Sequence, residues 1–406
     1  HMKNLIVGQS GGPTAVINAS LYGVVKEALG HQAEIGHVYG MVYGIEGFLQ
    51  DKYMDLGQEL SAEELELLKL TPAAYLGSCR YKLPEDLSAA FYATVFEKFK
   101  ELDIGYFLYI GGNDSMDTVS KLSRYAAEHG SDIRFIGIPK TIDNDLVQTD
   151  HTPGYGSAAK YVAATVREIV LDASVYRQKA VTIIELMGRH AGWLTAASVL
   201  ARKHKGDNPV LIYLPESDFE LEHFARDLEK ALKEQNSVIV CVSEGISDGS
   251  GTFICEYGDE AMVDNFGHKM LTGCGKVLES FVRRRFGVKV RSVELNVSQR
   301  CSGMAASAVD IEEAALAGST GVLAALAGET GKMIAFRRVG TDPYQMECCT
   351  VDVTQVCNQE QPVPSEWITE EANDIAQAYI DYALPLIMGE ADRPMEHGLP
   401  KYLYRR

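Results

Sequence analysis

The segment GIPKTIDND, residues 137–145, places a cation and two acids directly after an apolar run. Lys140 is followed by Asp143 and Asp145, whose carboxylates are two residues apart. A carboxylate can take the proton of an attacking hydroxyl, and a nearby ammonium can stabilise negative charge that develops during a reaction. The segment is therefore a candidate for general-base chemistry on an anionic substrate.

Two further segments have adjacent glycines between an apolar run and a helical pattern, namely QSGGPT (9–14) and IGGNDS (110–115). Such turns let backbone N–H groups approach a phosphate at a helix N-terminus. A tight turn without a ligand explains one such segment equally well. Two of them favour phosphate, with Gly11 in the first and with Asn113 and Asp114 in the second, where a Mg²⁺ ion could bind.

Several other polar side chains also follow apolar runs. They are Arg80 in LGSCR, Arg189 in MGRHAG, Glu244 in CVSEG, and Arg291 and Arg300 in RSVELNVSQR. A single arginine is more often part of a surface ion pair, and His190 more often a packed side chain than a catalyst. Together with the two glycine turns and Asp143, however, these residues suit phosphoryl transfer to a hydroxyl, which requires charge neutralisation, alignment and a base.

The net charge of −18 argues against binding to nucleic acid or to an anionic membrane surface. A small anionic ligand remains compatible with it, provided that Lys and Arg gather locally. No apolar run approaches the roughly 20 residues of a membrane span. The eight cysteines lack the paired spacing of a zinc site, which favours reduced thiols and a cytoplasmic protein.

Short apolar, β-rich runs that alternate with helical patterns position these residues. This alternation predicts an α/β fold with parallel-type sheets flanked by helices, and ligands in such folds bind beyond the carboxyl ends of the strands. The 406 residues suggest two or three domains. The segments that follow this pattern begin at KNLIVGQSGG, YFLYIGGNDS, FIGIPKTIDND, AVTIIELMGR, PVLIYLPES and SVIVCVSEG.

The ordered set of SGG, IGG, TIDND, MGR, SEG and the paired arginines resembles the 6-phosphofructokinase family over roughly residues 4–310. The resemblance implies two Rossmann-like lobes with the active site in the cleft between them. It implies a glycolytic phosphotransferase that uses Mg²⁺ and acts on the 1-hydroxyl of fructose 6-phosphate. It also implies a homodimer or homotetramer whose sugar-phosphate pocket takes basic residues from a neighbouring subunit, for which Arg177 and Lys179 are both candidates.

The resemblance also implies a role for each matched residue. Asp143 corresponds to the catalytic base and Asn113 to a metal ligand, although many members have aspartate at the latter position. Gly11 and Arg80 match the donor-phosphate site, and Arg291 and Arg300 the clamp on the 6-phosphate. The remaining matches are to sugar contacts: Thr141, Ile142, Met187, Gly188, Arg189, Glu244 and Val297, the last at a position where the family usually has His or Tyr.

Two positions predict the phosphoryl donor. ATP-using members resemble PGTIDND and GGDGS, with glycine where this chain has Lys140 and Asp114. A carboxylate at Asp114 would repel the α-phosphate of ATP, and the ammonium of Lys140 would stabilise the terminal phosphate of pyrophosphate. The sequence therefore predicts the pyrophosphate-dependent branch. The alternatives are an ATP-dependent kinase of the same fold and a non-catalytic, sugar-phosphate-binding subunit.

The expected lobes are a donor lobe of residues 2–140 plus about 255–305, and a sugar-phosphate lobe of about 141–254 plus about 306–406. The segments AALAGSTGVLAALAGETGKMIAF and ITEEANDIAQAYIDYALPLIM are expected to be helices that close the second lobe or line a subunit contact. Oligomer size, effectors and the physiological direction of the reaction are left open by these patterns.

Overall fold

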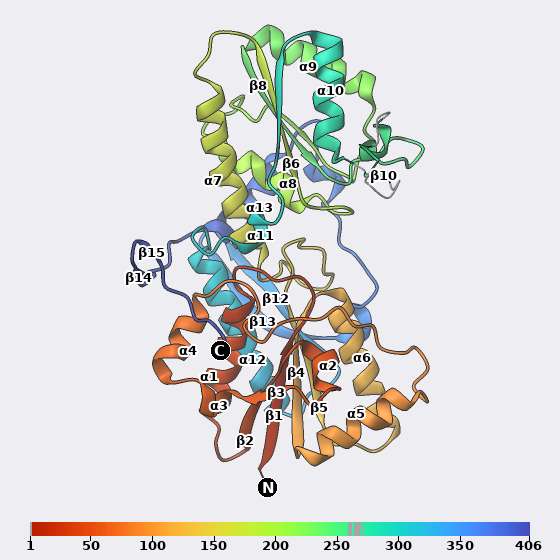
Figure 1. Cartoon of the computed structure of the whole chain (residues 1–406), viewed down its shortest axis with the longest axis vertical. Coiled ribbons are helices and arrows are strands. Elements are labelled where there is room, and N and C mark those ends of the chain that lie inside the picture. Colours follow the sequence, from red (N-terminus) through yellow and green to blue (C-terminus); the bar gives the residue numbers. More distant parts are fainter. Residues whose placement is uncertain (1, 259–261, 264–268, 271) are drawn as a thin grey trace. The chain divides into compact units, whose positions relative to one another are not determined.

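The computed structural model describes residues 2–258, 262–263, 269–270 and 272–406 (Figure 1). The chain forms two compact units. Unit 1 contains His1–Ser157, Arg300–Glu360 and Leu386–Arg406, and unit 2 contains Ala158–Gln299 and Gln361–Pro385. Each unit is a sheet flanked by helices, which confirms the expected α/β fold with two lobes.

Unit 1 is built on a seven-stranded sheet of order β13-β12-β5-β4-β1-β2-β3. The strands from β12 to β2 run parallel, whereas the two edge strands are antiparallel to their neighbours. An antiparallel neighbour needs no crossover connection, so the two edge strands depart from the pattern that predicts parallel strands. The strands are β1 (Lys3–Gln9), β2 (Ile35–Met41), β3 (Tyr53–Asp55), β4 (Ile104–Gly111), β5 (Arg134–Pro139), β12 (Lys332–Thr341) and β13 (Tyr344–Asp352).

Successive side chains of β1 point to opposite faces of this sheet. Leu5 and Val7 lie in a core with α1 (Ile17–Leu29) and α12 (Ala308–Leu326). Ile6 lies in a second core with α5 (Ala90–Glu101) and α6 (Asn113–Glu128). Both faces are therefore covered by helices, which is why the strand reads as a continuous apolar run.

Helices α1 and α12 approach each other closely in the first of these cores. A Cβ atom placed on Gly23 of α1 would lie 2.0 Å from the carbonyl oxygen of Ala315. One placed on Gly318 of α12 would lie 2.1 Å from the carbonyl oxygen of Ser20. The absence of side chains at these two glycines thus sets the distance between the helices.

Unit 2 contains a parallel four-stranded sheet of order β11-β6-β8-β7. Its core packs Val181, Ile183 and Val240 against α9 and α10. The strands are β6 (Ala180–Leu186), β7 (Leu211–Tyr213), β8 (Ser237–Ser243) and β11 (Lys289–Glu294), and the helices are α7 (Tyr155–Ala173, which begins in unit 1), α8 (Trp193–Ala196), α9 (Leu221–Glu234), α10 (Cys274–Phe286) and α13 (Gln377–Ala383).

The remaining elements are short. They are α2 (Gly44–Phe48), α3 (Leu56–Glu59), α4 (Ala62–Lys69), α11 (Ser298–Cys301), the β9–β10 pair (Met262–Val263 and Lys269–Met270), the β14–β15 pair (Met395–Glu396 and Leu399–Pro400), and 3₁₀ turns at Ala197–Ala201, Ile254–Tyr257, Val353–Gln355, Ser365–Trp367 and Leu384–Ile387.

The unit boundaries differ from those expected from the sequence. The first crossing lies after Ser157 and not after residue 140. Residues 300–360 join unit 1, because β12 pairs with β5. Residues 274–294 join unit 2, because β11 pairs with β6. These long-range pairings leave no local signal in the sequence.

The two segments expected to be helices are only partly helical. α12 ends at Leu326, and Gly328 and Gly331 then adopt positive φ angles before Lys332–Phe336 continues as part of strand β12. Within residues 368–388 the α-helix α13 covers only Gln377–Ala383, since Ile368 instead forms a β-bridge with Ile375. α12 also belongs to unit 1 and not to the lobe predicted for it.

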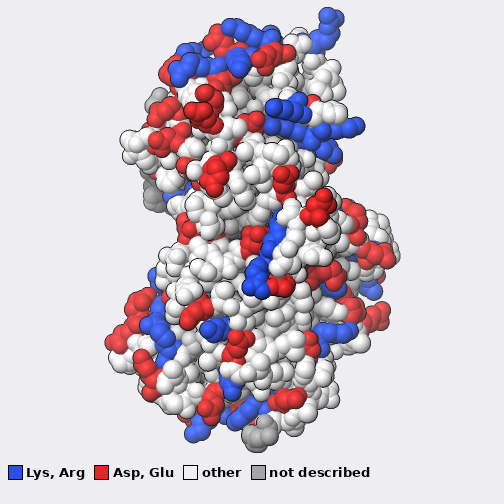
Figure 2. All heavy atoms as spheres, turned by 180° about the vertical axis from the view of Figure 1, so that it is seen from behind, with Lys and Arg blue, Asp and Glu red and all other residues white. Residues whose placement is uncertain are grey.

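Among the described residues, no helix is both long and apolar enough to cross a lipid bilayer. On the face shown in Figure 2, acidic and basic side chains are interspersed. The negative net charge of the chain is therefore compatible with local groups of cations.

We expect Gly318→Ala to lower the free energy of unfolding by about 1–3 kcal/mol, because a methyl group there forces α1 and α12 apart. This loss would outweigh the roughly 1 kcal/mol by which alanine favours a helix over glycine. Urea denaturation measures the difference. Ser319→Ala on the same helix is the matched control, and equal stability of the Gly318→Ala protein and wild type would contradict the close helix contact.

Candidate active site

Three of the turns singled out in the sequence meet at one edge of the unit 1 sheet. Strands β5, β4 and β1 are neighbours and run parallel, so their carboxyl ends lie together. The N–H of Lys140 donates to the carbonyl of Gly111 at 2.9 Å, and its ammonium Nζ donates to the carbonyl of Gly12 at 2.5 Å. Ser10 and Ser115 share a hydrogen bond between their hydroxyls. The turns after the three strands thus form one connected site.

Three cations surround the first glycine turn. A Cβ atom on Gly12 would lie 3.3 Å from both Arg80 Nη2 and Arg300 Nη1, and one on Gly11 would lie 3.2 Å from Lys140 Nζ. Gly11 also has a φ of +76°, which disfavours any other residue. The Nε atom of Arg300 is buried and has no hydrogen-bond partner among the described residues. Clustered cations with an unpaired donor are suited to an anion such as phosphate.

Burial and the clustering of cations lower the pKa of Lys140, which is 3% exposed. Burial, and then the positive charges of Arg80 and Arg300, lower the pKa of Lys140 from 10.5 to about 7. The carboxylates of Asp143 and Asp145 oppose this shift without reversing it. A bound phosphate would favour the protonated form of Lys140, because it supplies the missing negative charge.

The third turn carries the two acids, Asp143 and Asp145. The N–H of Asp143 donates to Thr141 Oγ1 at 3.1 Å, which closes a tight local turn. Burial, and then the charge of Asp143, raise the pKa of Asp145 to about 7. A carboxyl whose pKa lies near neutrality can exchange a proton at physiological pH.

The start of α6 carries the two residues suggested for cation binding. Asn113 Nδ2 donates to the carbonyl of Gln359 at 2.5 Å, whereas its Oδ1 is buried and meets no donor among the described residues. Asp114 beside it is exposed. Within the described part of the chain, no cluster of three or more His, Cys, Asp or Glu residues forms a complete metal site. An amide oxygen and one carboxylate fit Mg²⁺, which commonly completes its coordination with water and substrate phosphates.

A second group of predicted residues meets at the carboxyl edge of the unit 2 sheet, where β6 and β8 are neighbours. The N–H of Glu244 donates to the carbonyl of Leu186 at 2.9 Å, and the N–H of Gly188 donates to Glu244 Oε1 at 3.4 Å. Arg189 is exposed, and its guanidinium lies 4.8 Å from the ring centre of Phe253. The edge therefore presents a cation, Arg189, and a carboxylate, Glu244.

Arg291 lies apart from this group. It is exposed on the edge strand β11 and is paired with Thr182 in the middle of β6, not with the carboxyl end of that strand. Val297 is 47% exposed on the segment that follows. The paired arginines of the sequence are in different units, because Arg300 belongs to unit 1.

The structure thus sorts the predicted residues into sets. Unit 1 holds Gly11, Arg80, Asn113, Asp114, Lys140, Thr141, Ile142, Asp143 and Arg300, and unit 2 holds Met187, Gly188, Arg189, Glu244, Arg291 and Val297. Sequence reasoning did not select Gly12 or Gln299. The SGG turn contains the first, but no motif indicates that Gln299 Oε1 accepts the N–H of Met187 at 3.2 Å.

Comparisons with known proteins find matches among phosphofructokinases. The family model described as Phosphofructokinase matches residues 4–331. A pyrophosphate–fructose 6-phosphate 1-phosphotransferase of Methylococcus capsulatus is 39% identical over 404 residues, with 99% of this chain and 95% of that protein covered. The crystal structure of a pyrophosphate-dependent phosphofructokinase from Nitrosospira multiformis superposes with a TM-score of 0.90 at 36% identity, covering 99% of this chain and 96% of that one. An ATP-dependent 6-phosphofructokinase of Corynebacterium efficiens is 31% identical, with 82% of this chain and 92% of that protein covered.

The lowered pKa of Lys140 predicts a pH-dependent stability. Between about pH 7 and 10.5 the unfolded chain holds a proton on this lysine that the folded chain lacks, so stability rises with pH across this window. The charged lysine destabilises the ligand-free protein most below pH 7. We expect Lys140→Met to raise the midpoint of thermal unfolding clearly at about pH 6 and less at about pH 9.

Lys100→Met, which changes an exposed lysine, is the control and should show no such difference. A Lys140→Met effect that is the same at both pH values would contradict the buried, cation-flanked environment of Lys140.

Proposed function

The chain belongs to the phosphofructokinase family, and on that premise we propose that it transfers a phosphoryl group from pyrophosphate to the 1-hydroxyl of fructose 6-phosphate. The products are fructose 1,6-bisphosphate and phosphate. The observation that carries this proposal is the buried Lys140 ammonium between Arg80, Arg300 and the Gly11–Gly12 turn. That site holds the charge needed by a compact donor with two phosphates and no nucleoside.

The proton and the phosphoryl group are assigned to different side chains. Asp143 accepts the proton of the 1-hydroxyl, whose oxygen attacks the phosphorus as the bond to the leaving phosphate breaks. Lys140 stabilises the negative charge that shifts onto the leaving phosphate. Arg300, which the sequence pattern assigned to the 6-phosphate, lies beside Gly12 together with Arg80, and this position supports a role at the transferred or donor phosphate as well.

Donor choice depends on Asp114 and Lys140. The exposed carboxylate of Asp114 at the start of α6 opposes the α-phosphate of a nucleotide, while Lys140 takes over charge stabilisation at the terminal phosphate. This pairing favours pyrophosphate over ATP. Since pyrophosphate and the sugar bisphosphate differ little in phosphoryl-transfer potential, we expect the reaction to be reversible and to serve glycolysis or gluconeogenesis.

Mg²⁺ is the proposed cofactor, and it would supply charge neutralisation on the pyrophosphate oxygens. Asn113 Oδ1 and the carboxylate of Asp114 would contribute to holding it. The buried and unpaired amide oxygen of Asn113 supports this assignment.

The family resemblance assigns contacts with the sugar phosphate to six residues: Thr141, Ile142, Met187, Gly188, Arg189 and Glu244. Arg291 lies on an exposed edge strand, which supports contact with the 6-phosphate of a neighbouring subunit in a homodimer or homotetramer. Arg177 is exposed, whereas the ammonium of Lys179 donates to the carbonyl of Leu232, so Arg177 is the better candidate for a second crossing residue.

The proposed compartment is the cytoplasm. All eight cysteines are free thiols in the structure, and such thiols persist in a reducing environment.

Donor choice gives the first test. In a coupled assay with fructose 6-phosphate and Mg²⁺, pyrophosphate should support turnover and ATP should be poor or inert. Asp114→Gly should raise turnover with ATP, because it removes a carboxylate from the place of the α-phosphate. Asp132→Gly makes the same charge change just before β5, at the opposite edge of the sheet, and should leave ATP use unchanged. Robust wild-type turnover with ATP and none with pyrophosphate would refute the donor assignment.

The base gives the second test. Asp143→Asn should leave fructose 6-phosphate binding largely intact and reduce turnover by about 10²–10⁴, the usual contribution of a positioned general base. Calorimetric binding and the coupled assay measure the two quantities separately. Near-normal turnover would remove Asp143 from the mechanism and shift the role to Asp145.

A further inference from the structure

The segment after β5 folds back beneath the proposed base. The N–H of Thr141 donates to the carbonyl of Pro153 at 3.2 Å, and the N–H of Thr152 donates to Asn144 Oδ1 at 2.9 Å. Asn144 has a φ of 54°, so this return requires a left-handed residue directly after Asp143. Residues 152–154 therefore support the backbone on both sides of Asp143.

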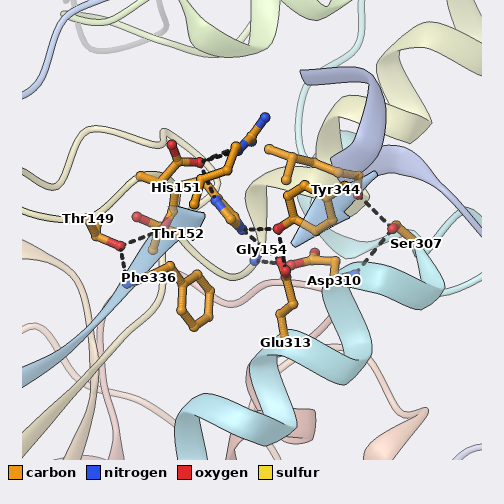
Figure 3. Close-up of polar contacts among 12 residues, drawn as sticks. Thr149, His151, Thr152, Gly154, Ser307, Asp310, Glu313, Phe336 and Tyr344 are labelled. Carbon is orange, nitrogen blue, oxygen red and sulfur yellow. Dashed lines mark hydrogen bonds and ion pairs between the residues drawn. The ribbon is translucent and has the colours of Figure 1, made fainter. Parts of the chain in front are cut away.

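Helix α12 holds this returning segment through Asp310, which is 3% exposed. Its Oδ1 accepts the N–H of Gly154 at 3.0 Å, and its Oδ2 accepts the N–H of Ser157 at 2.9 Å. Ser307 caps the helix by accepting the N–H of Asp310 at 3.2 Å. Figure 3 shows Asp310 on the first turn of α12 and Ser307 just before the helix begins. One buried carboxylate thus fixes the backbone at two points.

A second carboxylate of α12, Glu313, lies one turn further along the same face. Its Oε1 is 2.7 Å from His151 Nε2, while His151 Nδ1 is 2.8 Å from Asp150 Oδ2. Both ring nitrogens face carboxylates, so both donate and the imidazole is protonated. Burial alone would lower the pKa of His151, but the two carboxylates outweigh it and raise this pKa to about 9.

The hairpin β12–β13 completes the cluster (Figure 3). The hydroxyl of Tyr344 donates to Glu313 Oε2. Arg338 Nε donates to Asp150 Oδ2 at 3.1 Å, and its guanidinium lies 5.0 Å from the ring centre of Tyr344. The two cations, His151 and Arg338, thus balance the charges of Asp150 and Glu313.

Burying these charged side chains costs desolvation free energy. Well-packed apolar side chains generally hold a loop at least as stably as a buried set of ions, whereas removing one partner leaves an unpaired charge. The side chains of His151 and Glu313 are only 3% and 10% exposed. Hydrogen-bonded ions, unlike apolar contacts, define both direction and distance, and a catalytic carboxylate requires both.

We propose that Asp310 and Glu313 are positioning residues for phosphoryl transfer, which through Gly154 and His151 hold the segment that supports residues 141–144 and thereby fix the carboxylate of Asp143. This inference rests on the function proposed above. It extends that function to two residues of α12 that carry no motif and do not contact the reacting atoms.

The test is Glu313→Gln, which keeps the shape of the side chain but removes its charge. We expect kcat with pyrophosphate to fall about tenfold or more, with KM for both substrates within about twofold, because positioning of the base acts in the transition state. Asp310→Asn should behave alike. Tyr344→Phe removes only one hydrogen bond to Glu313, and it should lower kcat by a smaller factor in a protein that still folds.

Two controls separate positioning from damage. Glu312→Gln makes the same change on the adjacent residue, which is 69% exposed and pairs with Lys69 at 2.7 Å, and it should leave kcat unchanged. Val95→Ala opens a cavity in the core on the other face of the sheet. It should lower the unfolding temperature while leaving kcat near that of wild type.

The decisive measurement is a double-mutant cycle with Asp143→Asn. If Glu313 acts only through the base, Glu313→Gln should cause no further loss of kcat in the Asp143→Asn background. Losses that multiply would overturn the proposal, as would wild-type kcat in both Glu313→Gln and Tyr344→Phe. Wild type without pyrophosphate-dependent turnover would instead refute the proposed function, so the two failures are distinguishable.

Discussion

The parallel pairing of β1, β4 and β5 is the constraint on which the candidate site depends. Each strand ends in a turn that carries one group of candidate residues: glycines after β1, an amide and a carboxylate after β4, and the lysine and acids after β5. Parallel neighbours have their carboxyl ends at the same edge of the sheet. The pairing of these strands is therefore sufficient to bring the three turns together. A slip of one residue in this pairing would turn the core side chains to the wrong face, so the same apolar alternation that builds the core also fixes the site.

The site is assembled at some expense to the ligand-free protein. Lys140 is buried between two arginines, and this surrounding lowers its pKa to about 7. A bound anion would favour the protonated lysine, because it would supply the negative charge that this surrounding lacks. Arg300 Nε and Asn113 Oδ1 are two further buried polar atoms of this site, and neither has a hydrogen-bond partner among the described residues.

Helix α12 both packs in the core and holds the segment that returns after β5. On one side, Gly318 lets it pack closely against α1, which covers the sheet. On another, Asp310 and Glu313 accept hydrogen bonds from the segment that returns beneath Asp143. A helix of the core thus holds this segment, and functional sites are held most precisely when regular elements support them.

The sequence by itself determined the properties that are local. The strand-to-helix pattern predicted the α/β fold, and the motifs identified Gly11, Lys140 and Asp143 as members of one chemistry, because turn geometry and side-chain charge depend on neighbouring residues. Only the tertiary structure decided what depends on distant pairing. It placed β12 beside β5, assigned Arg300 and Arg291 to different units, and brought Glu313 to His151 across 162 positions of sequence separation. Helical periodicity marks one face of α12 as buried, but a buried carboxylate becomes meaningful only when the structure shows which group it pairs with.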